Sequence, residues 1–157
     1  MKIECAGFRQ ESCDDGPGIR SVLFLQGCGK NCPGCQNKQQ QVHGDGIWWD
    51  IEELVKFITA QCKNKKITIS GGEPLEQKEA LCVLGNILKM NGFNICVYTG
   101  WEWTQIPEEV FQFADFIKAG PYIEKLKQEN LRFVGSKNQV MKRKNALNCW
   151  GPVTLKS

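Results

Sequence analysis

Short β-rich segments alternate with amphipathic segments along most of this chain, and that alternation is the strongest constraint on its fold. Strands are expected at 19–25, 66–70, 94–99 and 116–118, with a fifth at 131–134. Helices are expected at 51–62, at 76–90 and from Pro107 onward. Strands that alternate with helices favour a mainly parallel sheet with right-handed crossovers. The sequence therefore predicts the α/β class.

Glycine-rich or cysteine-rich segments follow the first four expected strands. They are a cysteine cluster after the first, Gly71-Gly72-Glu73 after the second, Thr99-Gly100 after the third and Ala119-Gly120-Pro121 after the fourth. In parallel sheets, ligands bind beyond the carboxyl ends of the strands, which lie at one edge. We therefore expect these four segments to gather at one end of the fold.

The size and charge of the chain indicate a single domain over residues 1–157. A formal net charge of +3 is too small to indicate a nucleic-acid partner. No apolar run approaches the roughly 20 residues of a membrane helix, and no apolar targeting segment is visible at the N-terminus. A cytoplasmic protein without a membrane or nucleic-acid partner is the expectation.

Three of the nine cysteines lie close together as Cys28, Cys32 and Cys35, in a C-x3-C-x2-C spacing. Without an export signal, nine cysteines are not expected to form a disulfide framework. Gly29 and Gly34 give this loop the backbone freedom to wrap around one metal centre. Electron-carrying clusters and structural zinc usually take four protein ligands, so three ligands leave one coordination site open.

Two other interpretations of this loop remain open on spacing alone. One is a zinc site with Cys13 or His43 as a distant fourth ligand, although His43 lies in a glycine-rich turn typical of the surface. The other is a thioredoxin-like redox pair of Cys32 and Cys35, which leaves Cys28 without a role.

The Gly71-Gly72-Glu73 turn adds a carboxylate at the end of a strand. Two glycines allow close approach to the main chain, and a carboxylate there suits an ammonium group. Alone, this sequence is equally typical of a turn before a helix. Paired with the cysteine loop upstream, it becomes a specific signal.

Together, the cysteine loop and Gly-Gly-Glu-Pro resemble the radical S-adenosylmethionine (SAM) enzymes. The resemblance implies a [4Fe–4S] cluster held by Cys28, Cys32 and Cys35, with SAM chelating the fourth iron. It also implies that Gly71, Gly72 and Glu73 hold the methionine amino group, with Gly34 and Thr99 near the cofactor. The fold it implies is an incomplete, TIM-like β/α barrel.

Further motifs resemble the glycyl-radical activating enzymes, in particular those of anaerobic (class III) ribonucleotide reductase. They are Asp15-Gly16-Pro17-Gly18-Ile19-Arg20, Tyr98-Thr99-Gly100-Trp101, Gly120-Pro121-Tyr122 and 135–139, so the resemblance spans about residues 13–140. It implies an oxidoreductase that takes one electron from an external reductant and cleaves SAM. The 5′-deoxyadenosyl radical then removes a hydrogen atom from a glycine of the partner, the reductase catalytic subunit. The alternative is a radical SAM enzyme acting on another protein, peptide or small molecule.

Within this resemblance, Asp15, Gly16, Pro17, Gly18 and Arg20 are expected to line the rim where the partner's glycine loop enters. Three positions depart from the family pattern: Gln36 replaces His, Ala119 an acidic residue and Val134 an Arg. Lys118 is expected to supply a cation near the SAM carboxylate instead.

Two further expectations concern segments outside these motifs. Trp48 and Trp49 are expected to pack in the core. The basic run 137–144 is expected to be a solvated tail.

Overall fold

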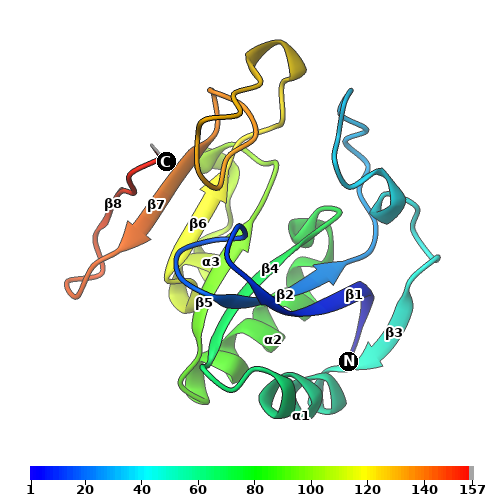
Figure 1. Ribbon diagram of the computed structural model, residues 1–157. Helices are drawn as coiled ribbons and strands as arrows, with labels where there is room; N and C mark the ends of the chain where they lie inside the picture. The colour runs from blue at the N-terminus through cyan, green and yellow to red at the C-terminus, as the bar shows by residue number, and fades with distance from the viewer. Residues whose placement is uncertain (156–157) are drawn as a thin grey trace.

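The computed structural model describes residues 1–155, which form a mixed α/β fold around one eight-stranded sheet (Figure 1). The strand order is β3-β1-β2-β4-β5-β6-β7-β8. The four central strands are parallel: β2 (Arg20–Leu25), β4 (Lys66–Gly71), β5 (Asn94–Tyr98) and β6 (Phe116–Ala119). The four flanking strands pair antiparallel: β1 (Lys2–Ser12), β3 (Ile47–Asp50), β7 (Val140–Lys144) and β8 (Trp150–Pro152). The α/β prediction is confirmed, whereas "mainly parallel" holds only for the centre of the sheet.

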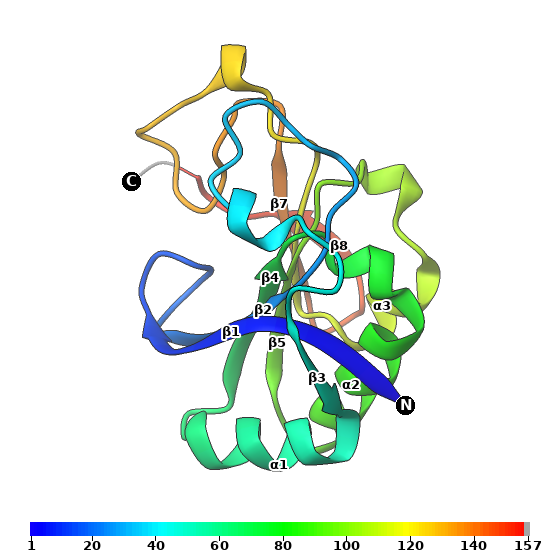
Figure 2. The same ribbon diagram turned by 90° about the vertical axis from the view of Figure 1, so that its right-hand side faces the viewer.

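Helices α1 (Ile51–Gln61), α2 (Lys78–Met90) and α3 (Glu108–Phe113) lie on one side of the sheet, and the 13–19 loop lies on the other (Figure 2). Helix α1 begins where predicted because the Asp50 side chain accepts a hydrogen bond from the Glu52 amide at 3.0 Å. A 3-10 turn, η2 (Pro74–Gln77), precedes α2. Among residues 1–155, none of the helices is long and apolar enough to cross a membrane.

The main core lies between the sheet and the helices, and strand alternation explains it. In β4, Ile67 and Ile69 belong to this core, whereas Thr68 and Ser70 point to the opposite face. A second, smaller cluster on that opposite face contains Cys96, Tyr98, Val134 and Met141. The face away from the helices therefore carries the polar and aromatic side chains that are available to a site.

Several sequence expectations outside the central sheet are wrong. Residues 131–134 are irregular, and the strand beside β6 is β7 instead, which lies in the run predicted as a solvated tail. In β7 the buried Met141 alternates with more exposed neighbours, so one face of a basic segment still packs on the sheet. Trp49 packs against Phe57 as expected, but Trp48 is 55% exposed on edge strand β3.

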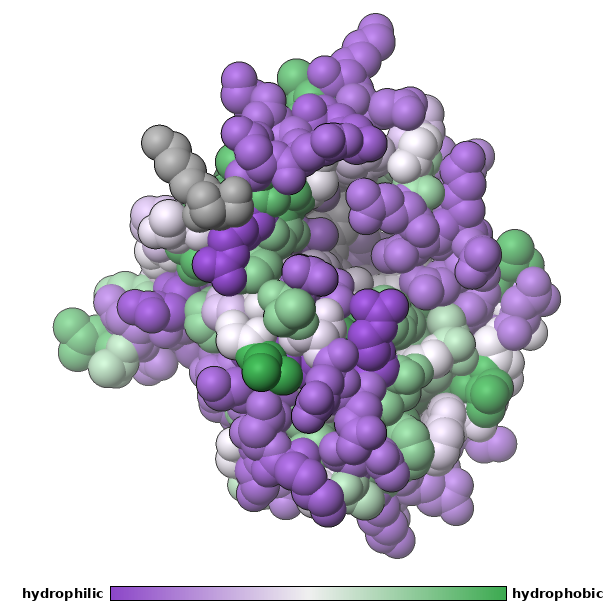
Figure 3. Space-filling model, viewed as in Figure 1, coloured by the Kyte–Doolittle hydropathy of each residue, from purple (hydrophilic) through white to green (hydrophobic). Residues whose placement is uncertain are grey.

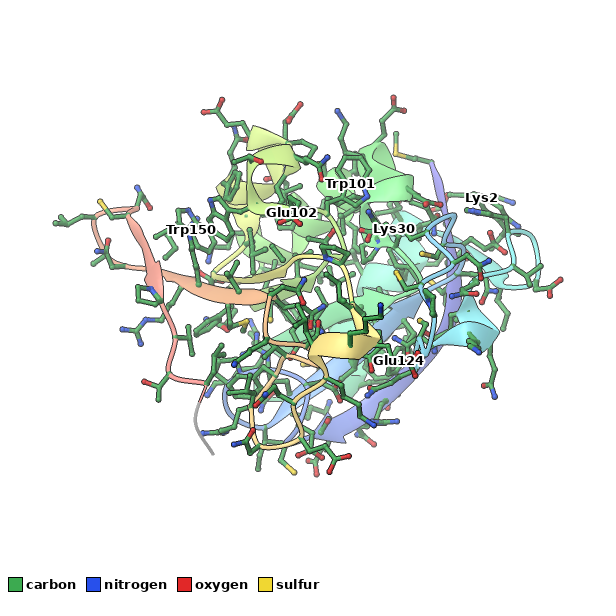
Figure 4. The ribbon with its side chains drawn as sticks, turned by 90° about the horizontal axis from the view of Figure 1, so that it is seen from above. Lys2, Lys30, Trp101, Glu102, Glu124 and Trp150 are labelled. Carbon is green, nitrogen blue, oxygen red and sulfur yellow. The ribbon has the colours of Figure 1, made fainter. Side chains whose placement is uncertain are left out.

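Two long loops rise beyond the carboxyl ends of the parallel strands and stand apart from each other (Figure 1). One is the cysteine loop after β2, and the other is the 120–139 segment, which includes η4 (Glu124–Leu126). Mostly hydrophilic residues surround the hollow between them (Figure 3). Lys30 and Glu124 lie on these two loops in the view from above (Figure 4). The predicted convergence of segments at this end is the arrangement observed.

Candidate active site

The cysteine loop begins directly at the end of β2 and is fixed by backbone hydrogen bonds. Gly27 N–H donates to the Gln40 carbonyl at 2.7 Å, and Cys28 N–H donates to the Gln41 carbonyl at 3.0 Å. The thiols of Cys28, Cys32 and Cys35 are partly exposed and line one pocket of about 120 Å³. The same pocket is lined by Gly71, Gly72, Glu73, Thr99 and Lys118. The structure thus brings together residues at, or just beyond, the carboxyl ends of four different strands.

Three thiols on one pocket fit a [4Fe–4S] cluster by number and by ligand type. Within residues 1–155, no three metal-ligating side chains are already arranged to hold a metal ion. The alternative zinc ligands lie elsewhere. His43 is 59% exposed and pairs with Glu76 at 3.0 Å, while Cys13 is exposed in the β1–β2 loop. Neither lines the pocket that the three cysteines share.

Glycine is required at positions 71 and 72 because the backbone there contacts the end of β2 and the start of the cysteine loop. A Cβ at Gly71, where φ is +114°, would lie 2.2 Å from the Leu25 carbonyl oxygen, and one at Gly72 would lie 2.3 Å from that of Gly27. The amides of Gly72 and Glu73 donate to these two carbonyls at 2.9 and 2.8 Å. From the sequence, a ligand was expected to make this close approach, whereas in the structure the approaching group is the polypeptide backbone.

Glu73 is a buried carboxylate at the carboxyl end of β4, only 1% exposed. Its Oε1 accepts hydrogen bonds from Thr99 Oγ1 at 2.7 Å and from the Leu75 amide at 3.0 Å. Its Oε2 accepts one from the Gly100 amide at 2.7 Å. Burial raises the pKa of Glu73, and these hydrogen bonds and the nearby Lys30 only partly oppose that effect. Thr99 therefore orients Glu73 and is held between it and the Trp101 amide.

Lys118 lies where the small pocket meets a larger cavity of about 510 Å³. Its Nζ is 3.9 Å from the centre of the Tyr98 ring, a cation–π contact. Burial lowers the pKa of Lys118 to about 8, against the nearby acidic groups, which favour its charged form. The Tyr98 hydroxyl is buried without a hydrogen-bond partner among the described residues. A cation and an unpaired hydroxyl thus border both spaces.

The Asp15–Arg20 segment does not act as one rim. Asp15 lines the large cavity, whereas Pro17 and Gly18 line a separate groove of about 430 Å³. Gly16 packs against the Arg20 side chain. Arg20 is 1% exposed at the amino end of β2, so its guanidinium does not reach the molecular surface.

The three departures from the family pattern occupy different environments. Gln36 and Val134 line the large cavity, and Ala119 is fully buried. Further residues line the small pocket that were not predicted as site residues, although Tyr98, Tyr122 and Gln139 belong to motifs quoted above: Lys30, Asn37, Ser70, Tyr98, Tyr122 and Gln139. Most of them end or follow a parallel strand, or lie in the cysteine loop. Their position in the sequence could therefore have identified them as pocket residues. Asn37 also donates to the Gly71 carbonyl at 3.0 Å, which links the two motifs.

Comparison with known proteins agrees with this geometry. Residues 14–142 match a family model described as "4Fe-4S single cluster domain". The anaerobic ribonucleoside-triphosphate reductase-activating proteins of Salmonella typhimurium and Escherichia coli K12 are each 30% identical over 138 residues, which is 81% of this chain and 90% of theirs.

Two more distant similarities were also found. The pyruvate formate-lyase-activating enzyme of Clostridium pasteurianum is 32% identical over 66% of this chain and 45% of its own length. The structure of QueE from Escherichia coli has a TM-score of 0.48 at 19% identity, over 64% of this chain and 53% of that one. From the family match and the 30% identity to full-length relatives, the protein belongs to the 4Fe-4S single cluster domain family, together with the activating proteins of anaerobic ribonucleoside-triphosphate reductase.

Proposed function

We propose that this protein is a radical SAM activase that generates a glycyl radical on anaerobic ribonucleotide reductase. One observation carries the proposal: the three cysteines, Glu73, Thr99 and Lys118 line one pocket at the carboxyl ends of the parallel strands. The similarity to reductase-activating proteins over 81% of the chain supports the same conclusion. When bound, a [4Fe–4S] cluster and SAM supply the one-electron cleavage chemistry that no side chain can provide.

The cysteine residues are proposed to hold the cluster in the loop after β2. Cys28, Cys32 and Cys35 are the ligands, and Gly34, with φ at +74°, allows the turn between the last two. The contact of Gly71 and Gly72 with Leu25 and Gly27 fixes the position of this loop relative to Glu73. Three ligands from one loop would leave one iron of a [4Fe–4S] cluster without a protein ligand.

The polar residues of the pocket are proposed to bind the methionine part of SAM. Glu73 accepts the amino group, because Oε2 has a single hydrogen-bond donor in the structure and retains accepting capacity. Lys118 pairs with the carboxylate of SAM. It supplies the cation of this part of the pocket, next to Ala119, which stands where the family pattern has an acidic residue. Thr99 holds Glu73 in position. Binding at these fixed groups orients SAM against the cluster, so that electron transfer is effectively intramolecular.

The larger cavity is proposed to receive the glycine-bearing segment of the partner. It adjoins the SAM pocket through Tyr98 and Lys118, and Asp15 lies on its wall. Gly16, Pro17 and Gly18 shape the loop that carries Asp15, and Arg20 supports that loop through its bond to the Pro17 carbonyl. Its place between the cysteine loop and the 120–139 segment would help to shield a radical from side reactions once the partner is bound.

The remaining features are inferred from the same assignment. We infer a single radical SAM domain over the chain, with the curved sheet as an incomplete barrel. A cytoplasmic location and an external one-electron reductant are also inferred, since thiolate ligands and a low-potential electron require reducing conditions.

Anaerobic reconstitution with iron and sulfide tests the proposal. We expect about four irons per chain, cleavage of SAM to 5′-deoxyadenosine on addition of dithionite, and an organic radical doublet in the electron paramagnetic resonance spectrum after addition of the reductase catalytic subunit. Cys35→Ala should abolish all three, while Cys149→Ala, an exposed cysteine far along the chain, should abolish none. SAM cleavage without a radical on the reductase would favour a different substrate. A colourless zinc protein would contradict the assignment as an enzyme.

A further inference from the structure

Glu76 connects the cysteine loop to the only histidine of the chain. Its Oε1 accepts a hydrogen bond from the Gly29 amide at 2.8 Å, between Cys28 and Cys32. Its Oε2 lies 3.0 Å from His43 Nε2. No motif in the sequence drew attention to Glu76, which follows Gly-Gly-Glu-Pro by two residues and lies in η2.

His43 occupies a defined place against the start of the cysteine loop. A Cβ at Gly27, where φ is +97°, would lie 2.2 Å from His43 Nδ1, so the ring packs directly on that glycine. The neighbouring carbonyls of Gln40 and Gln41 accept from the amides of Gly27 and Cys28. The ring therefore packs on Gly27 and pairs with Glu76, while the rest of the side chain is exposed.

Two physical effects of Glu76 on a cluster in this loop have the same sign. A fixed negative charge beside the loop disfavours the addition of an electron to a cluster held there, and Glu76 is tied to this loop through the Gly29 amide. In addition, Glu76 accepts from the Gly29 amide, which would otherwise be free to donate to a cluster sulfur. Hydrogen bonds to sulfur and local charge both set the potentials of iron–sulfur clusters.

We propose that Glu76, oriented by His43, is a positioning residue that keeps the reduction potential of the cluster low. The inference rests on the proposed function, because reductive cleavage of a sulfonium requires a low-potential electron. Glu76 touches no reacting atom in this assignment. It acts through the Gly29 amide and through its charge.

The test is a redox titration of the reconstituted protein without SAM, followed by electron paramagnetic resonance of the reduced cluster. All variants are titrated at the same pH and ionic strength. Glu76→Gln should raise the ratio of reduced to oxidised cluster about tenfold at a fixed potential, which is about 59 mV for one electron. Glu79→Gln is the matched control, since it removes the same charge from an exposed position in the first turn of α2, and should leave the potential unchanged.

Equal potentials for wild type and Glu76→Gln, each with a full complement of iron, would overturn the inference. If Glu76→Gln does not assemble a cluster, His43→Ala is measured in its place. A wild-type reduction potential in His43→Ala would then overturn the inference. The inference is supported if the reduction potential rises less in His43→Ala than in Glu76→Gln, and if the potential of Glu76→Asp stays near that of wild type. A wild-type protein that binds no cluster defeats the proposed function itself, so the two failures are distinguishable.

Discussion

The parallel strands carry a buried charged side chain at each of their two ends, and the two are bound differently. Arg20, at the amino end, makes five hydrogen bonds, to the Thr68 hydroxyl, to the carbonyls of Pro17, Ile67 and Asn94, and to the Asn94 side chain. Glu73, at the carboxyl end, accepts three and faces a pocket. Both are 1% exposed.

The difference between them separates a structural charge from a functional one. The guanidinium of Arg20 joins the starts of β2, β4 and β5, and all its nitrogens have partners within the chain. The carboxylate of Glu73 has accepting capacity left on the side of the pocket. Burial lowers the pKa of Arg20 and raises that of Glu73, so it disfavours the charged form of both side chains. Only Glu73 faces a pocket that a ligand can enter.

The largest expected effect is at the amino end. Arg20→Ala should lower the free energy of unfolding by about 4 kcal/mol, because it leaves a cavity and unpaired buried carbonyls. Urea unfolding of the apoprotein measures this. Arg9→Ala, which removes an exposed arginine 3.5 Å from Asp15, should cost less than about 1 kcal/mol. Equal costs for the two variants would mean that Arg20 is not the structural charge described here.

The glycine contact at the carboxyl end should show the next largest effect. Gly71→Ala should cost about 3 kcal/mol of unfolding free energy, since the new Cβ meets the Leu25 backbone at a positive φ. Gly7→Ala, where nothing lies within 4 Å of the added Cβ, is the control and should be close to wild type. A stable Gly71→Ala variant that still reconstitutes its cluster would contradict the role given to this contact.

A substitution of Lys118 tests whether the pocket at the carboxyl ends of the parallel strands binds an anionic group. Lys118→Met should weaken SAM binding to the reconstituted protein about tenfold, about 1.4 kcal/mol, measured by titration calorimetry. Because the pKa of Lys118 is lowered to about 8, wild-type affinity should fall as the pH rises through that value, and the variant should lack this dependence. Lys127→Met removes a lysine that also lines the large cavity and pairs with Glu129, and it should bind SAM normally.

The smallest effect concerns the stability contributed by Glu73 itself. A carboxyl whose folded pKa lies above its unfolded value stabilises the fold most at low pH, and that contribution is lost as pH rises from about 4.5 through the raised pKa. Glu73→Gln should therefore remove part of this decline. At pH 7 it should remain within about 1 kcal/mol of wild type, since the amide oxygen still accepts a hydrogen bond. Urea midpoints between pH 4 and 8 measure it, and parallel curves for the two proteins would refute it.

Local sequence patterns predicted the centre of the fold well. The helix cap at Asp50, the apolar strands and the glycines that end them are decided within a few residues, so β2, β4, β5, β6 and the start of α1 were predicted close to their observed bounds. The same logic predicted that Cys35, Glu73 and Thr99 would meet, because the carboxyl ends of parallel strands share one edge, whereas Lys118 was expected there only from the family resemblance. The flanking antiparallel strands were missed, since β1, β3 and β7 are stabilised by backbone pairing with distant residues.

By itself, the sequence determined which chemical groups gather at one end of a parallel sheet: three thiols, a carboxylate and a lysine. Only the tertiary structure decided which charged groups lie exposed, which are buried with all their partners, and which face a pocket. The residue type of Arg20 and the motif beside it do not reveal whether its side chain is exposed or buried. Its burial against Ile67 and Asn94 depends on strands that follow it by more than 40 residues. Such contacts depend on packing between distant segments, which no local pattern encodes.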